Sequence, residues 1–408
     1  MNEQLMLLGR NAKEAANQLR ILPADVRSEG IRAMARQVRL AEDDIVAANQ
    51  ADMAKATQNL DRLMLNSERV QAIADALDEV AALPDPVGEE IARWTRPNGL
   101  DIARVRTPIG VIGMIYESRP NVTADAAAIC VRSGNAVILR SGSDALSSSL
   151  AIHRALKAGL AEAGLPVHAV QLIDTPDREA VSQLLGGLGG TVDLVIPRGG
   201  KGLVERVQND AKVPVLSHLE GVCHTYVHAG ADADKAVSIV RNAKMRRVGI
   251  CGATECLLID ASVAEALLPR IAQALDGCEL RGDERARAIV PMQAATAEDW
   301  GKEYLAPTLA VRVVEGLDQA IDHIGRFGTA HTDAIITEDA AAAETFLNKV
   351  DSAIVIWNAS TQFADGGEFG FGAEIGIATG KMHARGPVGP EQLTSFHYVV
   401  RGTGQVRP

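Results

Sequence analysis

Hydrophobic residues near the N-terminus recur with the period of an α-helix. Two sets of four apolar residues each occupy positions i, i+3, i+4 and i+7, namely Ile31, Met34, Ala35 and Val38, and Val70, Ile73, Ala74 and Leu77. This spacing places each set on one face of a helix, so it predicts a helical region over residues 10–82. Residues 83–99 lack that period and contain several prolines and glycines, which favours an irregular connection.

Short apolar runs and helical stretches then alternate along the chain. A first group of predicted strands covers residues 109–116, 136–139, 169–173 and 192–196, with a helix over 145–163. A second group lies near residues 225–227, 255–259, 309–314, 334–337 and 353–357. Alternation of strand and helix is typical of right-handed βαβ units and a parallel sheet. The pattern therefore predicts two parallel-sheet α/β lobes.

The C-terminal segment differs from both lobes. It is rich in glycine from Phe363 onward and ends in an alternating strand over residues 395–400. A strand so far from a neighbour in sequence can complete the sheet of another lobe or of a partner subunit. The second option predicts an oligomer.

Composition excludes several classes of protein. The chain of 408 residues is 47% hydrophobic and 3% aromatic, and its 41 Lys and Arg against 52 Asp and Glu give a formal net charge of -11. The chain has no excess of positive charge and few aromatic side chains on which bases could stack, so nucleic acid is not an expected partner. No secretory pattern opens the chain, and no apolar run approaches the roughly 18 residues that a membrane helix needs. We therefore expect a soluble cytoplasmic protein that does not engage membranes.

The cysteines are expected to be free thiols, one of them reactive. They number five, and no two have the CxxC spacing, which argues against a disulfide framework. Cys251 lies between Gly249 and Gly252 with two arginines just upstream, a setting that lowers a thiol pKa and leaves the sulfur open to a substrate. The sequence favours packing roles for Cys130 and Cys256 and leaves Cys223 and Cys278 undecided.

Two predicted strand ends carry candidate ligand-binding residues. Arg140 and Ser141 lie at the carboxyl edge of the first sheet, where open α/β folds bind ligands, and Arg140 suits a ribose phosphate. Gly199 and Gly200 precede a helix, whose N-terminal N–H groups can bind a phosphate, although a plain tight turn fits equally well. The chain has neither a Walker A sequence nor a GxGxxG fingerprint.

Two histidine patterns remain open. His224 and His228 would share one face of a strand beside Cys223, but no further ligands are evident nearby, so a polar strand end is preferred to a zinc site. His331 follows an amphipathic helix and either orients a ligand or caps a turn.

A basic loop near the C-terminus is a candidate for substrate binding. Lys381, His383 and Arg385 gather three basic groups in one loop. Such a loop suits an anionic substrate if it faces a site, and otherwise faces water.

Several of these segments together resemble the aldehyde dehydrogenase superfamily, and more closely its gamma-glutamyl phosphate reductase branch. The resemblance covers nearly the whole chain. The Cys251 segment alone would only be suggestive. The other matching segments are YESRPNVT (116–123), ILRSGSDA (138–145), IPRGGKGL (196–203), KEYLAPTLAV (302–311), AIDHIGRFGTAHTDAI (320–335) and GFGAEIGIATGKMHARGPVGPEQLTS (370–395).

The resemblance implies a domain plan for an aldehyde dehydrogenase-like α/β fold with a small oligomerisation element. Residues 1–224 would form the cofactor-binding lobe, with an oligomerisation hairpin near 99–110. Residues 225–360 would form the lobe of the catalytic cysteine. The tail over 361–408 would return to the cofactor lobe and end in an oligomerisation strand.

The resemblance also implies residue roles, carried over by position. Cys251 corresponds to the nucleophile that forms a thioester, and Asn121 to the side-chain oxyanion donor that works with the backbone N–H of Cys251. Arg140 with Ser141, and the turn containing Gly199 and Gly200, resemble the adenosine and phosphate side of a cofactor site. Glu303 resembles the glutamate that holds the nicotinamide ribose. A basic strand end with no acidic residue to repel a 2′-phosphate favours NADPH over NADH.

Three positions stand apart from this correspondence. Glu220 lies near the place where hydrolytic members keep a general base for water, a role that would waste a thioester destined for reduction. Phe327 stands where this branch usually has Tyr or His, and Gly252 where Asn is common. These two departures affect local hydrogen bonds and not the nucleophile.

The reaction implied by the resemblance is the NADPH-dependent reduction of L-glutamyl 5-phosphate to L-glutamate 5-semialdehyde and phosphate, in proline biosynthesis. The sites for the substrate are assigned to Lys381, His383, Arg385 and His331. No metal is implied. The expected partners are a second copy of the chain, as a dimer or tetramer, and glutamate 5-kinase as a candidate that supplies the acyl phosphate.

Three rival functions remain open. The same fold could oxidise free aldehydes by hydrolysis, without any need for phosphate. A non-redox thiol acyltransferase or hydrolase would pair Cys251 with a histidine such as His331 and would not depend on a nicotinamide. A nucleotide-binding regulatory protein would bind a ligand without thiol reactivity.

Overall fold

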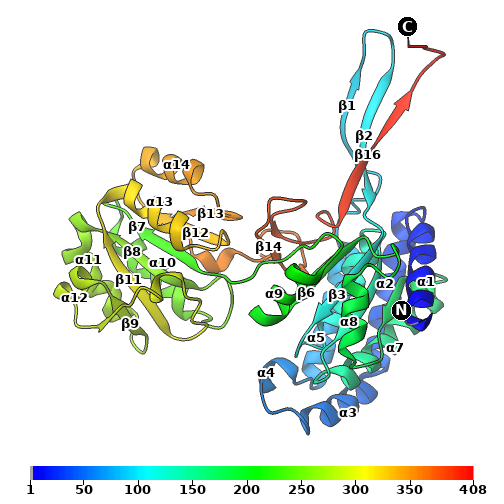
Figure 1. The fold of residues 1–408 in the computed structure, drawn as a ribbon, viewed down its shortest axis with the longest axis horizontal. Coiled ribbons are helices and arrows are strands. Elements are labelled where there is room, and N and C mark those ends of the chain that lie inside the picture. Colours follow the sequence, from blue (N-terminus) through cyan, green and yellow to red (C-terminus); the bar gives the residue numbers. More distant parts are fainter. Residues whose placement is uncertain (1–2, 408) are drawn as a thin grey trace. The chain divides into compact units, whose positions relative to one another are not determined.

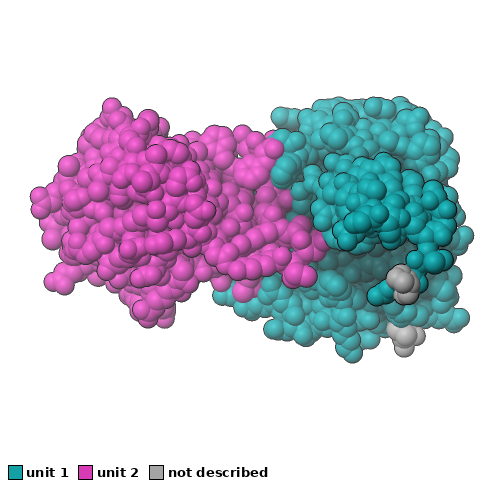
Figure 2. Space-filling view, turned by 90° about the horizontal axis from the view of Figure 1, so that it is seen from above, with its two compact units in different colours: residues 1–217, 370–376, 388–408 teal, residues 218–369, 377–387 magenta. Residues whose placement is uncertain are grey.

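The computed structural model describes residues 3–407, and the chain divides into two compact units (Figure 2). Unit 1 comprises residues 1–217, 370–376 and 388–408, and unit 2 comprises 218–369 and 377–387. The first boundary therefore falls before His218 and not after residue 224, because His218 and Gly221 contact residues of unit 2. The C-terminal tail is likewise shared, since residues 361–369 and 377–387 stay with unit 2.

The N-terminal region of unit 1 is helical, as its apolar spacing predicts. The apolar face of α2, which carries Ile31, Met34, Ala35 and Val38, is fully buried, and α2 packs against α5 and α7. Burial of such a face supplies most of the stability of a helix in a protein. The helices of this region are α1 (Glu3–Leu19), α2 (Ala24–Leu40), α3 (Glu42–Met53), α4 (Leu60–Leu63) and α5 (Ser67–Ala82).

A parallel sheet of four strands forms the centre of unit 1, in the order β5-β4-β3-β6. Its strands are β3 (Val111–Tyr116), β4 (Ala136–Ser141), β5 (Val170–Leu172) and β6 (Leu194–Arg198). The connecting elements are α6 (Val122–Arg132), α7 (Leu146–Glu162), η1 (Val167–Ala169), α8 (Arg178–Leu185) and α9 (Lys201–Asp210). The strand order reverses between β3 and β6, and ligands of open α/β sheets bind at the carboxyl ends beside such a reversal.

Unit 1 also carries an antiparallel sheet in the order β1-β2-β16. It consists of β1 (Glu90–Thr95), β2 (Asp101–Pro108) and β16 (Thr394–Arg401), and it extends away from the helices of the unit with the C-terminus near its tip (Figure 1). The irregular connection predicted over residues 83–99 is therefore wrong for β1. Only two residues of β1 are half-buried, so its apolar residues do not produce the alternation that marks a strand.

Unit 2 is built on a seven-stranded parallel sheet in the order β10-β9-β11-β8-β7-β12-β13. Its strands are β7 (Cys223–Val227), β8 (Thr254–Asp260), β9 (Glu279–Gly282), β10 (Gln293–Ala294), β11 (Thr308–Val314), β12 (Thr332–Ile336) and β13 (Ile354–Trp357). All five strands predicted for this part of the chain are present. The sequence analysis missed β9 and β10, which are short and at most partly buried along most of their length.

Helices cover both faces of this sheet. Alternate residues of β8 point to opposite layers: Leu257 and Ile259 pack with one hydrophobic cluster, and Cys256 and Leu258 with the other. The helical elements of unit 2 are α10 (Ala233–Met245), α11 (Ala261–Ala274), α12 (Glu284–Ile289), η2 (Asp299–Gly301), α13 (Gly316–Phe327), α14 (Ala340–Lys349) and η3 (Thr361–Phe363). A small antiparallel pair, β14 (Ile377–Ala378) and β15 (Gly386–Pro387), completes the unit.

Among residues 3–407, no helix combines the length and the apolar character required to cross a membrane.

Candidate active site

Cys251 lies in a turn of unit 2 between α10 and β8, and its side chain is half-buried. The backbone around it is closely packed. A Cβ atom at Gly221 would stand 2.2 Å from the Cys251 carbonyl oxygen, so only glycine fits there. The Cys223 thiol donates to that same oxygen at 3.1 Å. These contacts fix the turn that presents the Cys251 sulfur.

Two histidines flank the Cys251 thiol. Ligand-type atoms of His218, Cys251 and His331 all lie within 4.8 Å of one another. The two imidazole rings meet edge to face with centroids 5.1 Å apart. His218 Nδ1 lies 2.8 Å from the carbonyl oxygen of Ile377 in β14, and His331 Nδ1 lies 2.9 Å from Thr332 Oγ1 at the start of β12. The tail segment and the central sheet thus each hold one histidine.

The charge environment of Cys251 favours a thiolate. Burial raises the pKa of the Cys251 thiol, but His331 and His218 outweigh that effect and hold the pKa well below its usual value. The other four cysteines lack this advantage: burial raises the pKa of Cys130, Cys223, Cys256 and Cys278. Because the thiolate is the nucleophilic form of cysteine, the lowered pKa makes Cys251 the candidate nucleophile among the five cysteines.

Glu303 lies beside the Cys251 turn. Its Oε1 accepts a hydrogen bond of 2.9 Å from the backbone N–H of Gly221. Burial raises the pKa of the Glu303 carboxyl, and the negative charges of Cys251 and Glu220 act in the same direction. The glutamate assigned to the nicotinamide ribose is therefore close in space to the nucleophile.

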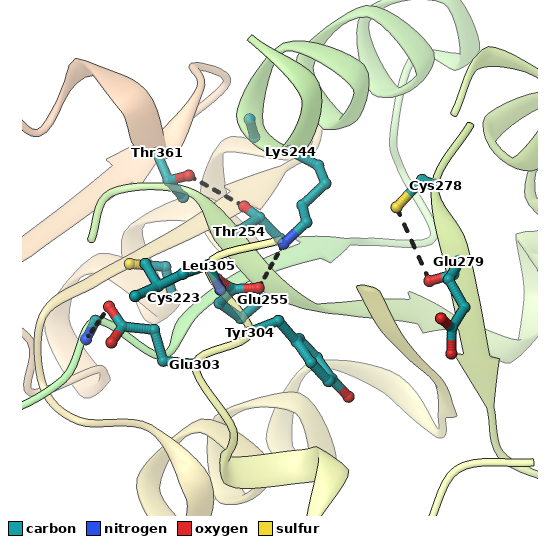
Figure 3. Close-up of polar contacts among 12 residues, drawn as sticks. Cys223, Lys244, Thr254, Glu255, Cys278, Glu279, Glu303, Tyr304, Leu305 and Thr361 are labelled. Carbon is teal, nitrogen blue, oxygen red and sulfur yellow. Dashed lines mark hydrogen bonds and ion pairs between the residues drawn. The ribbon is translucent and has the colours of Figure 1, made fainter. Parts of the chain in front are cut away.

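A fully buried ion pair supports the segment that carries Glu303 (Figure 3). Lys244 from α10 pairs with Glu255 of β8, and neither side chain is exposed to solvent. The second carboxylate oxygen of Glu255 accepts a hydrogen bond of 3.2 Å from the backbone N–H of Leu305. Burial raises the pKa of Glu255 to about 7, against the lowering effect of Lys244. The pair thus ties the segment of Glu303 to the central sheet.

In unit 1, Arg140 and Ser141 end β4, and Arg140 lines a cleft of about 450 Å³, whereas Ser141 is buried and is not among the lining residues. Arg140 is largely buried and donates from Nη2 to the carbonyl oxygen of Pro176 at 3.0 Å, while its Nε has no hydrogen-bond partner among the residues that the structure describes. Burial lowers the pKa of Arg140. Arg178 and Arg206 line the same cleft. Three guanidinium groups therefore converge at the carboxyl end of the sheet.

The expectation that no acidic residue lies at this strand end is wrong. Glu117, directly after β3, and Asp144 both line the cleft. The Glu117 carboxylate accepts a hydrogen bond of 3.3 Å from the backbone N–H of Gly200, and a Cβ at Gly199 would stand 2.5 Å from it. Sequence distance hid these contacts, since β3 and β6 are neighbours only in the sheet. The three arginines still leave the cleft with an excess of positive charge.

Asn121 directly precedes the first residue of α6 in unit 1, and its side chain does not cap that helix. Its side-chain Nδ2 donates to Asp125 Oδ2 at 2.9 Å. This bond uses one of two amide N–H groups and fixes the direction of the other. Burial raises the pKa of Asp125 to about 6.

The basic loop of the tail is engaged with a carboxylate. Lys381 pairs with Asp351, and Arg385 Nη1 donates to the same residue at 2.6 Å. His383 is exposed to solvent. Two of the three predicted substrate-binding cations therefore share one carboxylate within unit 2.

The two sequence departures have local packing explanations. A Cβ at Gly252 would stand 3.2 Å from the carbonyl oxygen of Thr361, so glycine lets the Cys251 turn lie against that carbonyl. The Phe327 ring packs against His323 with centroids 4.7 Å apart. Each residue thus makes a close packing contact at its position.

His224 lies on β7 and His228 directly follows that strand, and each has a protein partner. His224 Nδ1 lies 2.9 Å from Asp333 Oδ1, and His228 Nδ1 lies 2.8 Å from Thr337 Oγ1.

His218 is the site residue that the sequence analysis missed. It opens the segment HLEG, in which only Glu220 drew attention. His331 and Ile377, which contact it, lie far away along the chain, so no spacing pattern could have indicated it.

Comparisons with known proteins agree with this architecture. The model of the aldehyde dehydrogenase family matches residues 2–300. The chain is 63% identical to the gamma-glutamyl phosphate reductase of Caulobacter vibrioides, over 98% of this chain and 99% of that protein. It is 59% identical to the protein of the same name from Hyphomonas neptunium, over 100% and 97% of the two chains. The crystal structure of gamma-glutamyl phosphate reductase from Thermotoga maritima is 43% identical over the full length of both chains, with a TM-score of 0.97.

Proposed function

This chain belongs to the aldehyde dehydrogenase family, among the gamma-glutamyl phosphate reductases, and on this premise we propose that it reduces L-glutamyl 5-phosphate to L-glutamate 5-semialdehyde with NADPH. The observation that carries the proposal is the half-buried Cys251 thiol held between His218 and His331. A thiolate at this point can attack an acyl phosphate and expel phosphate, which leaves a thioester on Cys251.

The residues around Cys251 supply the remaining steps of the proposed reaction. NADPH, when bound, supplies a hydride. The thioester is a better hydride acceptor than a carboxylate, which is why a covalent intermediate helps. The imidazoles stabilise the thiolate that attacks and the thiolate that leaves when the hemithioacetal collapses to the aldehyde. The backbone N–H of Cys251 and the family position Asn121 are the proposed donors to the oxyanion.

The cleft of unit 1 suits a phosphorylated nucleotide. Arg140 has a buried guanidinium nitrogen with no partner within residues 3–407, and because buried polar groups are usually hydrogen-bonded, a ligand oxygen would satisfy it. Arg178 and Arg206 add positive charge. The turn at Gly199 and Gly200 lies beside the cleft-lining carboxylate of Glu117. We assign the 2′-phosphate of NADPH to the arginines and the nicotinamide ribose to Glu303.

The substrate's amino and carboxyl groups remain to be assigned. Lys381 and Arg385 can take the α-carboxylate only by leaving Asp351, which competes for them. His331 is already beside the thiol. We therefore place His331 at the reacting acyl group. The loop that contains Lys381 and Arg385 is the proposed site for the α-carboxylate of the substrate.

Replacement of Arg140 by alanine is expected to weaken the binding of NADPH far more than the binding of NADH. A hydrogen bond to a charged group is worth about 1.5–3 kcal/mol, so the KM for NADPH should rise roughly 10- to 100-fold. The KM for NADH, which lacks the 2′-phosphate, should change by less than about threefold. Steady-state kinetics with both cofactors measure this, with the exposed Arg154→Ala as a control. Equal changes in the two KM values would contradict the assignment of Arg140 to the 2′-phosphate.

The alkylation rate of Cys251 is expected to depend on pH through its two histidines. Because the imidazoles lower the thiol pKa, the rate with iodoacetamide should reach half its maximum well below the usual thiol pKa of about 8.5. His331→Ala and His218→Ala should each move that midpoint upward. A wild-type midpoint near 8.5 would contradict the thiolate assignment.

The proposed function is tested in the reverse direction. Purified protein, glutamate 5-semialdehyde and NADP should form NADPH only when inorganic phosphate is present, because phosphate must cleave the thioester. A rate that does not depend on phosphate would identify a hydrolytic aldehyde dehydrogenase, with Glu220 as the first residue to test as base. No NADPH formation in either case would favour a non-redox thiol enzyme.

A further inference from the structure

Unit 2 contains two clusters with the same kinds of side chain, and only one of them can bind a metal ion. Each cluster has one cysteine and two histidines whose ligand-type atoms lie within 4.8 Å of one another: His218, Cys251 and His331, and His224, Cys256 and His323. One sulfur and two imidazole nitrogens are ligands that Zn²⁺ prefers in tetrahedral sites. The hydrogen bonds around each cluster decide which nitrogens have a lone pair to donate.

The hydrogen bonds of the buried cluster of His224, Cys256 and His323 exclude it as a metal-binding site. Arg312 Nη1 lies 2.7 Å from His323 Nδ1. A guanidinium group can only donate, so Nδ1 of His323 accepts and the proton of the neutral ring is on Nε2. That Nε2 lies 3.6 Å from Cys256 Sγ. A nitrogen that carries a proton has no lone pair for a metal, so this cluster is a hydrogen-bonded packing unit.

The cluster around Cys251 has the opposite arrangement. His218 Nδ1 lies 2.8 Å from the carbonyl oxygen of Ile377, which can only accept, so this nitrogen carries the proton and Nε2 has the lone pair. A histidine whose one N–H donates to a backbone carbonyl while the other nitrogen binds metal is the usual arrangement in metal sites.

His331 supplies the third potential ligand. Its Nδ1 is engaged with Thr332 Oγ1 and lies 3.6 Å from Cys223 Sγ. Its Nε2 is buried and has no hydrogen-bond partner within the described part of the chain. An unsatisfied buried nitrogen of this kind is costly and gains a partner when a cation binds.

We propose that His218, Cys251 and His331 form an inhibitory Zn²⁺ site, in which the metal takes the Cys251 sulfur and one nitrogen of each histidine. The fourth position of a tetrahedral zinc ion would hold water. Zinc bound to the sulfur removes the lone pair that attacks an acyl group, so occupancy and turnover exclude each other. Mg²⁺ and Ca²⁺ prefer oxygen ligands and do not fit the site. The site follows from the geometry of unit 2 and does not depend on the identity of the substrate.

Direct binding of the metal tests the site independently of any reaction. The full-length protein, freed of metal with a chelator, is titrated with CoCl₂ as a spectroscopic probe and with ZnCl₂ in equilibrium dialysis. We expect one ion per chain and a thiolate-to-cobalt charge-transfer band, both absent in Cys251→Ala. The variant His218→Ala should weaken Zn²⁺ binding at least about tenfold, in line with the loss of one ligand of three.

The matched control is Cys256→Ala, which removes the cysteine of the other cluster and should leave Zn²⁺ affinity unchanged. Zinc binding that is lost in Cys256→Ala and kept in Cys251→Ala would overturn the proposal, as would unchanged affinity in both His218→Ala and His331→Ala. If buried His331→Ala does not fold, the half-buried His218 position still decides the outcome. Where the protein turns over glutamate 5-semialdehyde, ZnCl₂ but not MgCl₂ should inhibit, and a chelator should restore the rate.

Discussion

Cys251→Ala is expected to lower kcat by roughly 10⁴-fold or more while cofactor binding is retained. Loss of a covalent nucleophile removes the whole thioester pathway, and such losses are among the largest that one substitution causes. The arginines assigned to the 2′-phosphate of NADPH line a cleft of unit 1, whereas Cys251 belongs to unit 2. We therefore expect the substitution to lower turnover while it leaves the affinity for NADPH nearly unchanged. The measurements are steady-state kinetics and fluorescence titration with NADPH.

Cys278→Ala is the matched control for this substitution. Cys278 has a half-buried side chain in the same unit as Cys251, but burial raises the pKa of its thiol to about 11. The Cys278→Ala variant should therefore keep a kcat within about twofold of the wild-type value. Substantial activity in Cys251→Ala would contradict the assignment of Cys251 as the nucleophile and the proposed thioester.

Lys244→Met is expected to cost unit 2 about 3–5 kcal/mol of stability, because removal of one partner leaves a buried charge without compensation. Lys244 and Glu255 are both fully buried, and Lys244 Nζ also lies 5.9 Å from the centre of the Tyr304 ring. Methionine nearly preserves the volume of lysine, so the loss reports the charge and not a cavity. The two units need not unfold together, so hydrogen exchange of the amides in α10 and β8 is the appropriate measurement.

The pH dependence of this variant has a defined sign. The pKa of Glu255 is already raised to about 7 by burial, and loss of Lys244 removes an effect that lowers it. A carboxyl whose pKa in the folded state exceeds the unfolded value near 4.3 stabilises the fold at low pH, and this contribution is lost as pH rises through the folded value. The cost of Lys244→Met should therefore be larger at pH about 8 than at pH about 6.

The neutral pair provides the control for this experiment. In the double variant Lys244→Met, Glu255→Gln, the amide oxygen can still accept the N–H of Leu305 that Glu255 accepts in the wild type. At least half of the lost stability should return, without any dependence on pH in this range. A loss below about 1 kcal/mol in the single variant, or an equal loss at both pH values, would show that the pair contributes no buried charge.

Much of the candidate site could be predicted from sequence because its residues follow strand ends. Arg140 and Ser141 end β4, Gly199 and Gly200 follow β6, and the strands themselves were predicted within a few residues of their observed bounds. Apolar runs of this length between turn residues are reliable indicators of buried parallel strands. Cys251 also stood out locally, through its flanking glycines.

The neighbours of these residues could not be predicted in the same way. Glu117 meets Gly200 only because β3 and β6 pair across the sheet, and that pairing corrects the expectation of a cleft without acidic residues. His218 meets Cys251 and His331 through three different elements. The strand β1 was missed because its side chains are largely exposed, so burial imposed no pattern on its sequence.

The sequence by itself determined the type and order of most elements, the choice of Cys251 as the candidate nucleophile and the absence of a Walker A or GxGxxG phosphate loop. These properties depend on residues close together along the chain, where apolar period and turn chemistry act directly. Only the tertiary structure decided which histidines flank the thiol, which nitrogen of each ring is occupied, and which charges share the cleft of Arg140. Those properties depend on strand order and on hydrogen-bond partners from distant segments, which no local pattern encodes.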